Sequence, residues 1–250
     1  KYGTFLFLML LMIIFSVSTN SFLTVQNLTN VLRQISMIGI CTVGMTMIII
    51  SGGIDLSIGS TVALTGIILA KLLVAGVSVP LAVLITLLAG VVLGAINGFL
   101  INRISIPPLI ATLGTITMYR GITYIITGGL GVYGFPEEFR VIGQGYVGFM
   151  PIPVVIMLFM FALGYFILYH TPLGQYIYGV GSSEKVSYLS GVDVKKVKYF
   201  VYIFSGFLGG LAGVVMLSRL NSGLPNTATG FELDVVTAVV LGGISITGGE

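Results

Sequence analysis

The chain has few charged residues and almost none of the side chains that bind metals or form disulfides. Only 8% of its 250 residues are charged, whereas soluble domains carry about 25%. One cysteine, Cys41, excludes an internal disulfide, and one histidine, His170, cannot build a zinc site alone. No glycine-rich loop ending in Gly-Lys-Ser or Gly-Lys-Thr is present, so the chain has no recognisable P-loop for ATP. An ordinary soluble enzyme is excluded, and no cofactor is expected.

Long apolar runs recur along the whole chain. Hydrophobic residues make up 56% of the sequence and the mean hydropathy is +1.11, which predicts a multi-spanning α-helical membrane protein. The strands of an outer-membrane barrel would alternate with a period of two, so that class is excluded. The net charge of +3 comes without a basic tract, and nucleic-acid binding is not expected. We expect an all-α polytopic bundle, with residues 1–250 forming one transmembrane domain.

Eight predominantly apolar segments are candidate membrane spans. Prolines fall at or between their ends, where helix breakers belong, and several segments are shorter than the roughly 20 residues that a straight span needs. The segments are Thr4–Val17, Ile35–Ile50, Thr61–Gly76, Val79–Ile96, Leu109–Thr127, Ile152–Tyr169, Phe200–Leu217 and Leu233–Gly242.

Lysine and arginine residues predict the orientation of these spans. If all eight cross, Lys1, Arg103, Lys185, Lys195, Lys196 and Lys198 lie on one side and Arg33, Lys71, Arg140 and Arg219 on the other. The basic stretch 170–198 is therefore placed in the cytoplasm. The N-terminus is then cytoplasmic too, and residues 128–150 are external.

Glycines recur at a spacing of four residues within the apolar segments. Gly90, Gly94 and Gly98 show this spacing, as do the pairs Gly206/Gly210 and Gly209/Gly213. Such spacing removes bulk from one helix face and lets another backbone approach closely. We expect tight packing inside one subunit rather than a dimer seam.

Two glycine-rich segments interrupt this pattern and predict broken helices. Residues 51–59 place two adjacent glycines, a carboxylate and two serines directly after an apolar run, and residues 242–249 align with residues 52–59. Unwound backbone at membrane depth is tolerated only where protein or a water-filled cavity satisfies it. Paired interrupted segments of this kind point to the substrate path of a transporter. The candidate path residues are Ser51, Gly52, Gly53, Asp55, Ser57, Arg120, Gly242, Gly243, Ser245 and Thr247.

Asp55 has a functional and a structural interpretation. An ionisable residue at membrane depth is a functional-site hypothesis, here a polar wall of the path. Alternatively, Asp55 caps the helix that restarts at residues 57–60 or pairs with Arg120. Glu232 and Asp234 precede the last segment, where carboxylates stabilise a helix N-terminus. Whether the two glycine-rich copies run parallel or inverted stays open.

These motifs resemble one known family. The stretches that carry the resemblance are residues 44–60, residues 111–114 with Arg120-Gly121, residues 171–181, residues 189–198, and the stretch from Gly230 to Gly249. Taken together, they are similar to the motifs of the ribose-type permeases. Those proteins are the membrane subunits of bacterial ABC importers for monosaccharides. The resemblance covers nearly the whole chain.

The resemblance implies a sugar permease of the bacterial inner membrane that is not itself an enzyme. It implies about ten spans, so that one or two would follow Glu250, and three partners: a second permease subunit, which would make a homodimer, a cytoplasmic ATP-binding subunit and an extracytoplasmic sugar-binding protein. It also implies that residues 184–191, within a coupling loop at 170–198, seat in the ATPase. The candidate coupling residues are Gly181, Glu184, Lys185, Leu189, Ser190 and Gly191.

Alternatives remain for both the coupling loop and the whole chain. Helix-forming residues that end at Gly191 predict a short helix with a left-handed cap, but a basic loop held near anionic lipid is also possible. The chain as a whole is alternatively an ion-coupled secondary transporter whose broken helices bind a cation. An intramembrane enzyme is a distant third, because no metal-ligand cluster or nucleophile–base set appears in the sequence.

Overall fold

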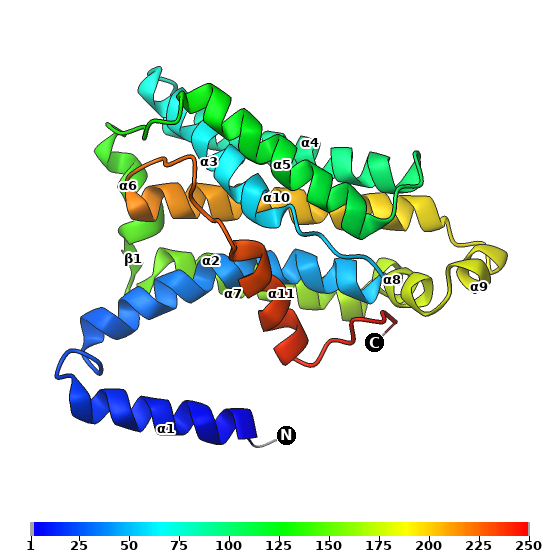
Figure 1. Ribbon diagram of the computed structural model, residues 1–250, viewed down its shortest axis with the longest axis horizontal. Helices are drawn as coiled ribbons and strands as arrows, with labels where there is room; N and C mark the ends of the chain where they lie inside the picture. The colour runs from blue at the N-terminus through cyan, green and yellow to red at the C-terminus, as the bar shows by residue number, and fades with distance from the viewer. Residues whose placement is uncertain (1–2, 250) are drawn as a thin grey trace.

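The computed structural model describes residues 3–249, which form helices joined by short loops. Two residues named in the sequence predictions lie outside the described residues. They are Lys1, which the charge pattern places in the cytoplasm, and Glu250, after which further spans were expected. The helices are α1 (Gly3–Ser18), α2 (Val25–Ile50), α3 (Ile58–Val74), α4 (Val79–Asn102), α5 (Pro108–Thr127), α6 (Glu137–Gln144), α7 (Ile152–His170), α8 (Pro172–Ser182), α9 (Glu184–Leu189), α10 (Val194–Leu220) and α11 (Phe231–Leu241). A two-residue antiparallel hairpin, β1 (Tyr146–Val147) with β2 (Met150–Pro151), precedes α7 (Figure 1).

All eight apolar segments fall on helices, but some helices begin or end well outside the apolar run. Helix α2 begins ten residues before Ile35, because the Thr24 side chain caps it and accepts a hydrogen bond from the backbone N–H of Asn27. Helix α10 begins at Val194, before Phe200, because the side chain of Asp193 caps it. Capped polar turns of this kind extend a helix beyond its apolar run, and hydropathy does not detect them.

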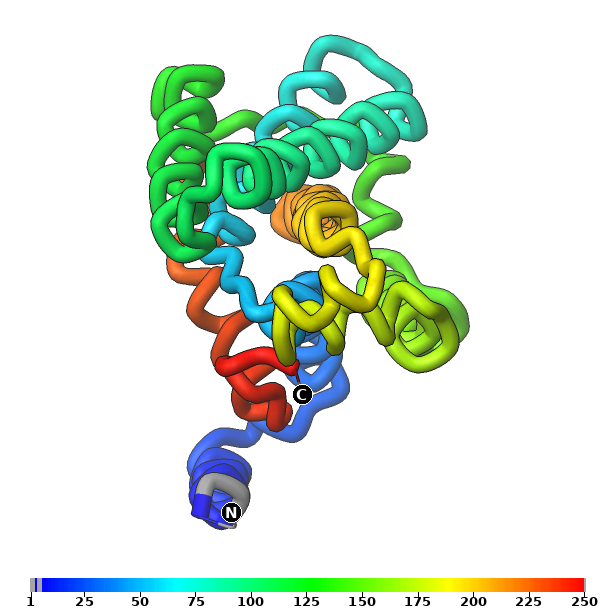
Figure 2. The backbone as a smooth tube through the Cα atoms, turned by 90° about the vertical axis from the view of Figure 1, so that its right-hand side faces the viewer, coloured from blue at the N-terminus to red at the C-terminus, as the bar shows by residue number. Residues whose placement is uncertain are grey.

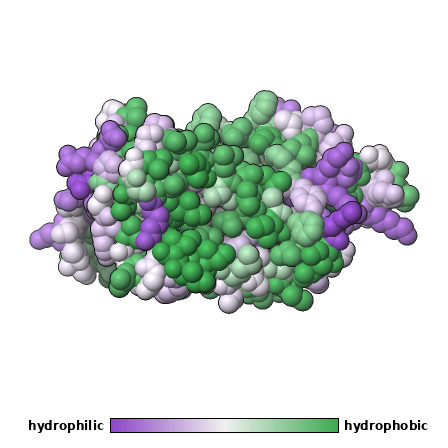
Figure 3. All heavy atoms as spheres, turned by 90° about the horizontal axis from the view of Figure 1, so that it is seen from above, coloured by the Kyte–Doolittle hydropathy of each residue, from purple (hydrophilic) through white to green (hydrophobic). Residues whose placement is uncertain are grey.

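The molecule has an apolar middle and two polar ends. Figure 3 shows hydrophobic residues in a wide band, with hydrophilic residues gathered at both ends. Among the described helices, α2, α4, α5, α7 and α10 are long and apolar enough to cross a membrane; α1 and α3 are shorter apolar helices. An apolar band between polar ends is the surface that a protein in a bilayer presents. The chain is a polytopic helical membrane protein.

Helix α10 is the centre of the bundle. It packs against α4, α2 and α3, and Figure 2 shows it surrounded by the other long helices. Helix α1 lies apart from the bundle (Figures 1 and 2), and most of its apolar side chains are exposed. Helices α8 and α9 lie at the opposite end of the bundle from α6 (Figure 1).

Glycines make the contact between α4 and α10. A Cβ on Gly94 would meet the carbonyl oxygen of Tyr202, and a Cβ on Gly90 would meet that of Gly206. The reverse also holds, because a Cβ on Gly206 would meet Gly90 and Gly94. The expectation that the spaced glycines pack helices within one subunit is confirmed for this pair.

Candidate functional site

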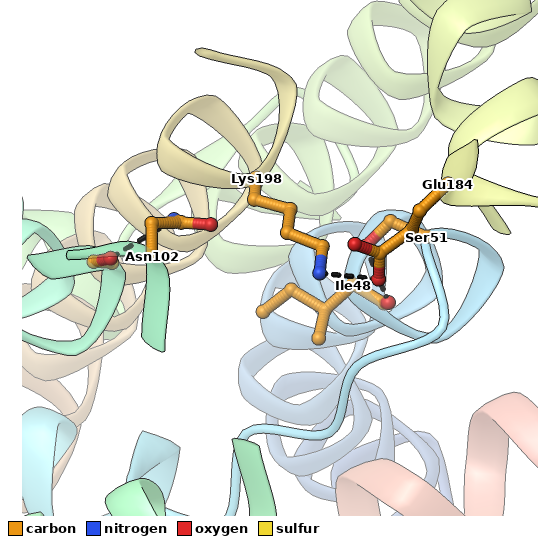
Figure 4. Close-up of polar contacts among 6 residues, drawn as sticks. Ile48, Ser51, Asn102, Glu184 and Lys198 are labelled. Atoms are coloured by element: carbon orange, nitrogen blue, oxygen red, sulfur yellow. Dashed lines mark hydrogen bonds and ion pairs between the residues drawn. The ribbon is translucent and has the colours of Figure 1, made fainter. Parts of the chain in front are cut away.

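The first glycine-rich segment ends α2 with a left-handed cap. Gly52 has a φ of +81°, and its N–H donates to the carbonyl oxygen of Ile49 (2.9 Å), while the N–H of Gly53 donates to that of Ile48 (2.9 Å). This pair of bonds is the Schellman arrangement, which favours glycine at the left-handed position. The Ser51 hydroxyl also donates to the carbonyl oxygen of Ile48, at 2.8 Å (Figure 4). Helix α3 resumes only at Ile58.

Asp55 is buried and organises the restart of α3. Its Oδ1 accepts hydrogen bonds from the backbone N–H of Ser57 (2.9 Å) and from the Ser57 hydroxyl (2.6 Å). Ser57 is the N-cap residue of α3, so Asp55 holds the cap and does not itself cap the helix. The hydroxyl of Ser205 on α10 donates to the other carboxyl oxygen, Oδ2, at 3.5 Å. Asp55 is only 2% exposed.

A buried polar chain continues from Ser57 to two further helices. The Asn97 amide on α4 donates to the Ser57 hydroxyl (2.7 Å), and the Thr115 hydroxyl on α5 donates to the amide oxygen of Asn97 (2.8 Å). Both side chains are buried. Buried polar groups that are all satisfied fix one arrangement of the helices that carry them. The break between α2 and α3 is thus tied to α4, α5 and α10.

Arg120 contacts the loop before α11 and not Asp55. Its guanidinium donates to the carbonyl oxygens of Pro225 (3.0 Å), Thr227 (2.6 Å) and Ala228 (3.4 Å). The suggested pairing of Asp55 with Arg120 is therefore wrong: those carbonyls already occupy the guanidinium. Glu232 and Asp234 lie in the first turn of α11, where their charge favours the helix N-terminus.

The second glycine-rich segment repeats the local geometry of the first. Gly243 has a φ of +102°, and its N–H donates to the carbonyl oxygen of Val240 (3.0 Å), which ends α11 by the same type of cap. The hydroxyl groups of Ser245 and Thr247 lie 2.7 Å apart, and the N–H of Thr247 donates to the Ser245 hydroxyl. Ser245 and Thr247 therefore correspond to Asp55 and Ser57.

One detail of the sequence alignment differs from the structure. The alignment pairs Gly52 with Gly242, whereas the left-handed cap positions are Gly52 and Gly243. The first helix therefore ends one residue earlier relative to the shared motif, with Ser51 rather than glycine at the last cap position. Local backbone hydrogen bonds determine which glycine takes the left-handed position, and a sequence alignment does not reveal it.

The two glycine-rich segments meet each other and α8 at one point. The N–H of Gly249 donates to the carbonyl oxygen of Ile50 at 2.9 Å. Gly181, near the end of α8, packs so closely that a Cβ there would overlap the Ile50 carbonyl and lie 2.7 Å from the Gly249 nitrogen. We call this contact of Ile50, Gly181 and Gly249 the glycine junction. It brings a predicted coupling residue into contact with the end of α2, directly before the first glycine-rich segment, and with the end of the second segment.

The segment from α8 to α10 is ordered by three N-caps. The side chains of Thr171, Ser183 and Asp193 accept hydrogen bonds from the backbone N–H groups of Gly174, Val186 and Lys196, respectively. Donation from Lys196 lowers the pKa of the Asp193 carboxyl, a group at the surface. Such caps start helices at defined residues, so the stretch is a pair of short helices and not an irregular loop. Helix α8 was not expected from the sequence.

Helix α9 confirms the predicted short helix and its left-handed cap. Gly191 has a φ of +86°, and the N–H groups of Gly191 and Val192 donate to the carbonyl oxygens of Tyr188 and Ser187, both at 3.0 Å. Glu184, in the first turn of α9, forms an ion pair with Lys198 on α10 at 2.5 Å (Figure 4). Lys185, Leu189 and Ser190 are exposed.

Sequence reasoning missed several residues that the structure brings into these sites. Asn97, Thr115 and Ser205 join Asp55 and Ser57 from three other helices. On α2, polar side chains at positions 34, 42 and 46 share one helix face because they are spaced by four or eight residues. That spacing was a usable signal, whereas contacts between distant helices leave no trace in one sequence.

Substitutions at Asp55 should separate its acceptor oxygen from its charge. Asp55→Ala leaves the buried Ser57 N–H and hydroxyl without their acceptor, which costs about 1–3 kcal/mol. Asp55→Asn keeps one carbonyl oxygen in that place and should retain most of the stability. The melting temperature of the purified protein in detergent measures both. Equal loss in the two variants would mean that the charge, not the acceptor, holds the restart of α3.

Comparisons with known proteins bear on the whole chain. Residues 27–249 match the family described as branched-chain amino acid transport system / permease component. The ribose import permease proteins of Haemophilus influenzae and Bacillus subtilis are 43% and 41% identical to it, over 99% and 100% of the chain and 78% of each relative. The D-allose transport system permease protein of Escherichia coli is 40% identical, over 100% of the chain and 77% of the relative. No solved structure matches the chain.

Proposed function

The chain belongs to the family of branched-chain amino acid transport system / permease components, and from this premise we propose that it is the membrane subunit of an ABC importer for a monosaccharide. Relatives that share its full length are named as ribose and allose permeases, which supports a sugar as cargo. These relatives are permease components, so ATP hydrolysis belongs to a separate cytoplasmic subunit. The ion-coupled secondary transporter is not favoured.

The exposed apolar surface of α9 supports a role in coupling to the ATPase. Val186, Tyr188 and Leu189 are 61%, 73% and 74% exposed, at the polar end of the molecule that lies outside the apolar band (Figures 1 and 3). Exposed apolar side chains outside the bilayer indicate a protein contact. We propose that they seat in the ATPase, with residues 170–198 as the coupling segment.

Two contacts would carry motion from α9 into the bundle. The Glu184–Lys198 pair joins α9 to α10, the central helix. The glycine junction joins the end of α8 to the end of α2, directly before the first glycine-rich segment, and to the end of the second segment. Movement of α8 and α9 on ATP binding would then act on both segments together. In this proposal Ser51–Ser57 and Gly242–Gly249 are the unwound parts of broken membrane helices that close the path on the cytoplasmic side.

The proposed topology follows from this assignment. With α8 and α9 in the cytoplasm, α6 at the opposite end of the bundle (Figure 1) is external. If α1 spans, the N-terminus is cytoplasmic, and eight helices of this chain cross or enter the membrane. Two permease subunits, an ATPase and an extracytoplasmic sugar-binding protein would complete the importer.

Uptake by the reconstituted importer tests the proposed function. Proteoliposomes that contain the permease and the ATPase should take up D-ribose or a related sugar only with ATP inside and the binding protein outside. Uptake driven by an ion gradient in the permease alone would contradict the proposal.

Disruption of α9 should release the ATPase. Valine at the left-handed position of Gly191 costs about 1–3 kcal/mol of local strain, so Gly191→Val should unravel the end of α9 and reduce co-purification of the ATPase. Glu184→Lys removes the ion pair with Lys198 and should give a smaller loss, since exposed pairs contribute about 0–1 kcal/mol. Val141→Ala, an exposed apolar position on α6 at the other end, is the control. Full retention of the ATPase in the Gly191 variant would remove α9 from the coupling role.

A further inference from the structure

Helices α2, α7 and α11 border an open groove of about 770 Å³. Its lining includes Gln34, Thr42 and Thr46 from α2, Asp234 and Thr237 from α11, and Phe161 from α7. A smaller hollow of about 170 Å³ shares Thr42, Thr46 and Phe161 and extends the groove along α7. The volume falls within the range of about 300–1,000 Å³ that is usual for small-molecule sites.

Four of the five polar side chains that line this groove have no partner among the described residues. Within residues 3–249, no hydrogen bond or ion pair reaches the side chains of Gln34, Thr46, Asp234 or Thr237, whereas the Thr42 hydroxyl donates only to the Gly39 carbonyl oxygen of its own helix. Unpaired polar groups at membrane depth are costly unless they face water or a ligand. Four unpaired polar side chains on the facing helices α2 and α11 therefore indicate a hydrated passage.

The course of the groove fits a passage from the outer end to the glycine-rich segments. At one end lies Gln34, whose neighbour Arg33 donates to the carbonyl oxygen of Gln144 in α6. At the other end lie Gly242 and Ile244, in the second glycine-rich segment. The groove thus connects the α6 end of the molecule with the segment that reaches the glycine junction.

We propose that the groove between α2 and α11 is the wall of the translocation path for an uncharged sugar, an inference that rests on the proposed function. The amide of Gln34, the Thr46 and Thr237 hydroxyls and the Asp234 carboxylate offer donors and acceptors to sugar hydroxyls. Phe161, 41% exposed, offers a flat apolar surface to the face of a sugar ring. The lining formed by the described residues contains one carboxylate and no lysine or arginine, so a phosphorylated sugar is excluded.

This proposal moves the path away from Asp55. Asp55 and Ser57 are buried and satisfied by each other and by Ser205, and neither lines the groove. They hold the restart of α3 in place, whereas groove side chains contact cargo. Weak, distributed contacts suit a passage, because a deep binding well would slow release.

Cysteine labelling in the assembled importer tests the groove. Wild-type protein supplies the background, since its only cysteine, Cys41, is fully buried. Thr46→Cys and Thr237→Cys should react with a charged thiol reagent at least about tenfold faster than Val92→Cys, an exposed position on the apolar helix α4, because only the thiolate reacts and an apolar surrounding disfavours it. D-ribose delivered by the binding protein should slow the reaction, and ribose 5-phosphate should not. Groove cysteines as slow as Val92→Cys would overturn the proposal.

Valine substitutions supply a second measurement. Thr46→Val and Thr237→Val keep the shape and remove the hydroxyl, and together they should lower sugar uptake about tenfold, the effect of losing one or two hydrogen bonds to cargo. Thr123→Val is the matched control, since that hydroxyl donates only to the Tyr119 carbonyl oxygen of its own helix. Normal uptake by the double variant would contradict the proposal that the groove is the wall of the path, and it would leave the proposed function of the chain unaffected. Failure of the wild-type importer to transport any sugar would count against the proposed function instead.

Discussion

Valine at position 94 should prevent α4 from packing on α10 and abolish assembly of the folded permease. A Cβ on Gly94 would meet the Tyr202 carbonyl oxygen and lie 3.1 Å from the Cα of Gly206. Both obstacles are backbone atoms of a central helix, so no side-chain movement relieves them. Overpacking typically costs about 1–3 kcal/mol, and a clash with backbone belongs at or above the top of that range. Fluorescence-detected size-exclusion chromatography of the expressed protein measures the loss of the folded peak.

A valine at Gly114 provides the matched control for this prediction. Gly114 also lies in a long apolar helix, α5, but a Cβ there meets nothing within 4 Å. Both variants replace helical glycine by the same residue, so their effects on helix propensity are equal. A folded peak of normal size for Gly94→Val would show that α4 and α10 separate without loss of the bundle.

The helices were predictable from the sequence because solvent dictates them. In a bilayer, a segment must be apolar and must satisfy its own backbone groups, so each apolar run became a helix. The α4–α10 contact was predictable in kind, since the spacing of Gly90 and Gly94 clears one face for a neighbouring backbone. The identity of the partner helix was not predictable, because a single sequence does not show which two glycine-lined helix faces pack together.

The sites were less predictable than the fold. The residues Gly52, Asp55 and Gly243 were identified from composition, because glycine and a carboxylate at membrane depth need a structural or functional reason. Their roles required contacts that the chain makes over long distances. Ser57 meets Asn97 across 40 residues, and Glu184 meets Lys198 from a different helix. The groove depends on threonines of α2 lying opposite α11, an arrangement that only the folded chain creates.

Alanine at position 181 should uncouple ATP hydrolysis from uptake while leaving the bundle folded. The Gly181 Cα lies against the Ile50 carbonyl, so even one added methyl group would displace α8 from the end of α2 and from Gly249. The Gly249 N–H donates to the same Ile50 oxygen, so the displacement also disturbs the second glycine-rich segment. In the proposed function this contact transmits motion from the coupling segment to the closed end of the path.

Gly179→Ala separates contact from propensity in this test. Both glycines lie in α8, and alanine stabilises a helix by about 0.5–1 kcal/mol over glycine at either position. A Cβ on Gly179 meets only the Ser187 hydroxyl, at 3.2 Å, and that side chain can turn away. We expect Gly179→Ala to transport normally, whereas Gly181→Ala should still bind the ATPase through α9 yet hydrolyse ATP without taking up sugar. Normal uptake per ATP in the Gly181 variant would show that the glycine junction serves only to pack the helices and does not transmit motion. The motion would then have to pass through Lys198 into α10.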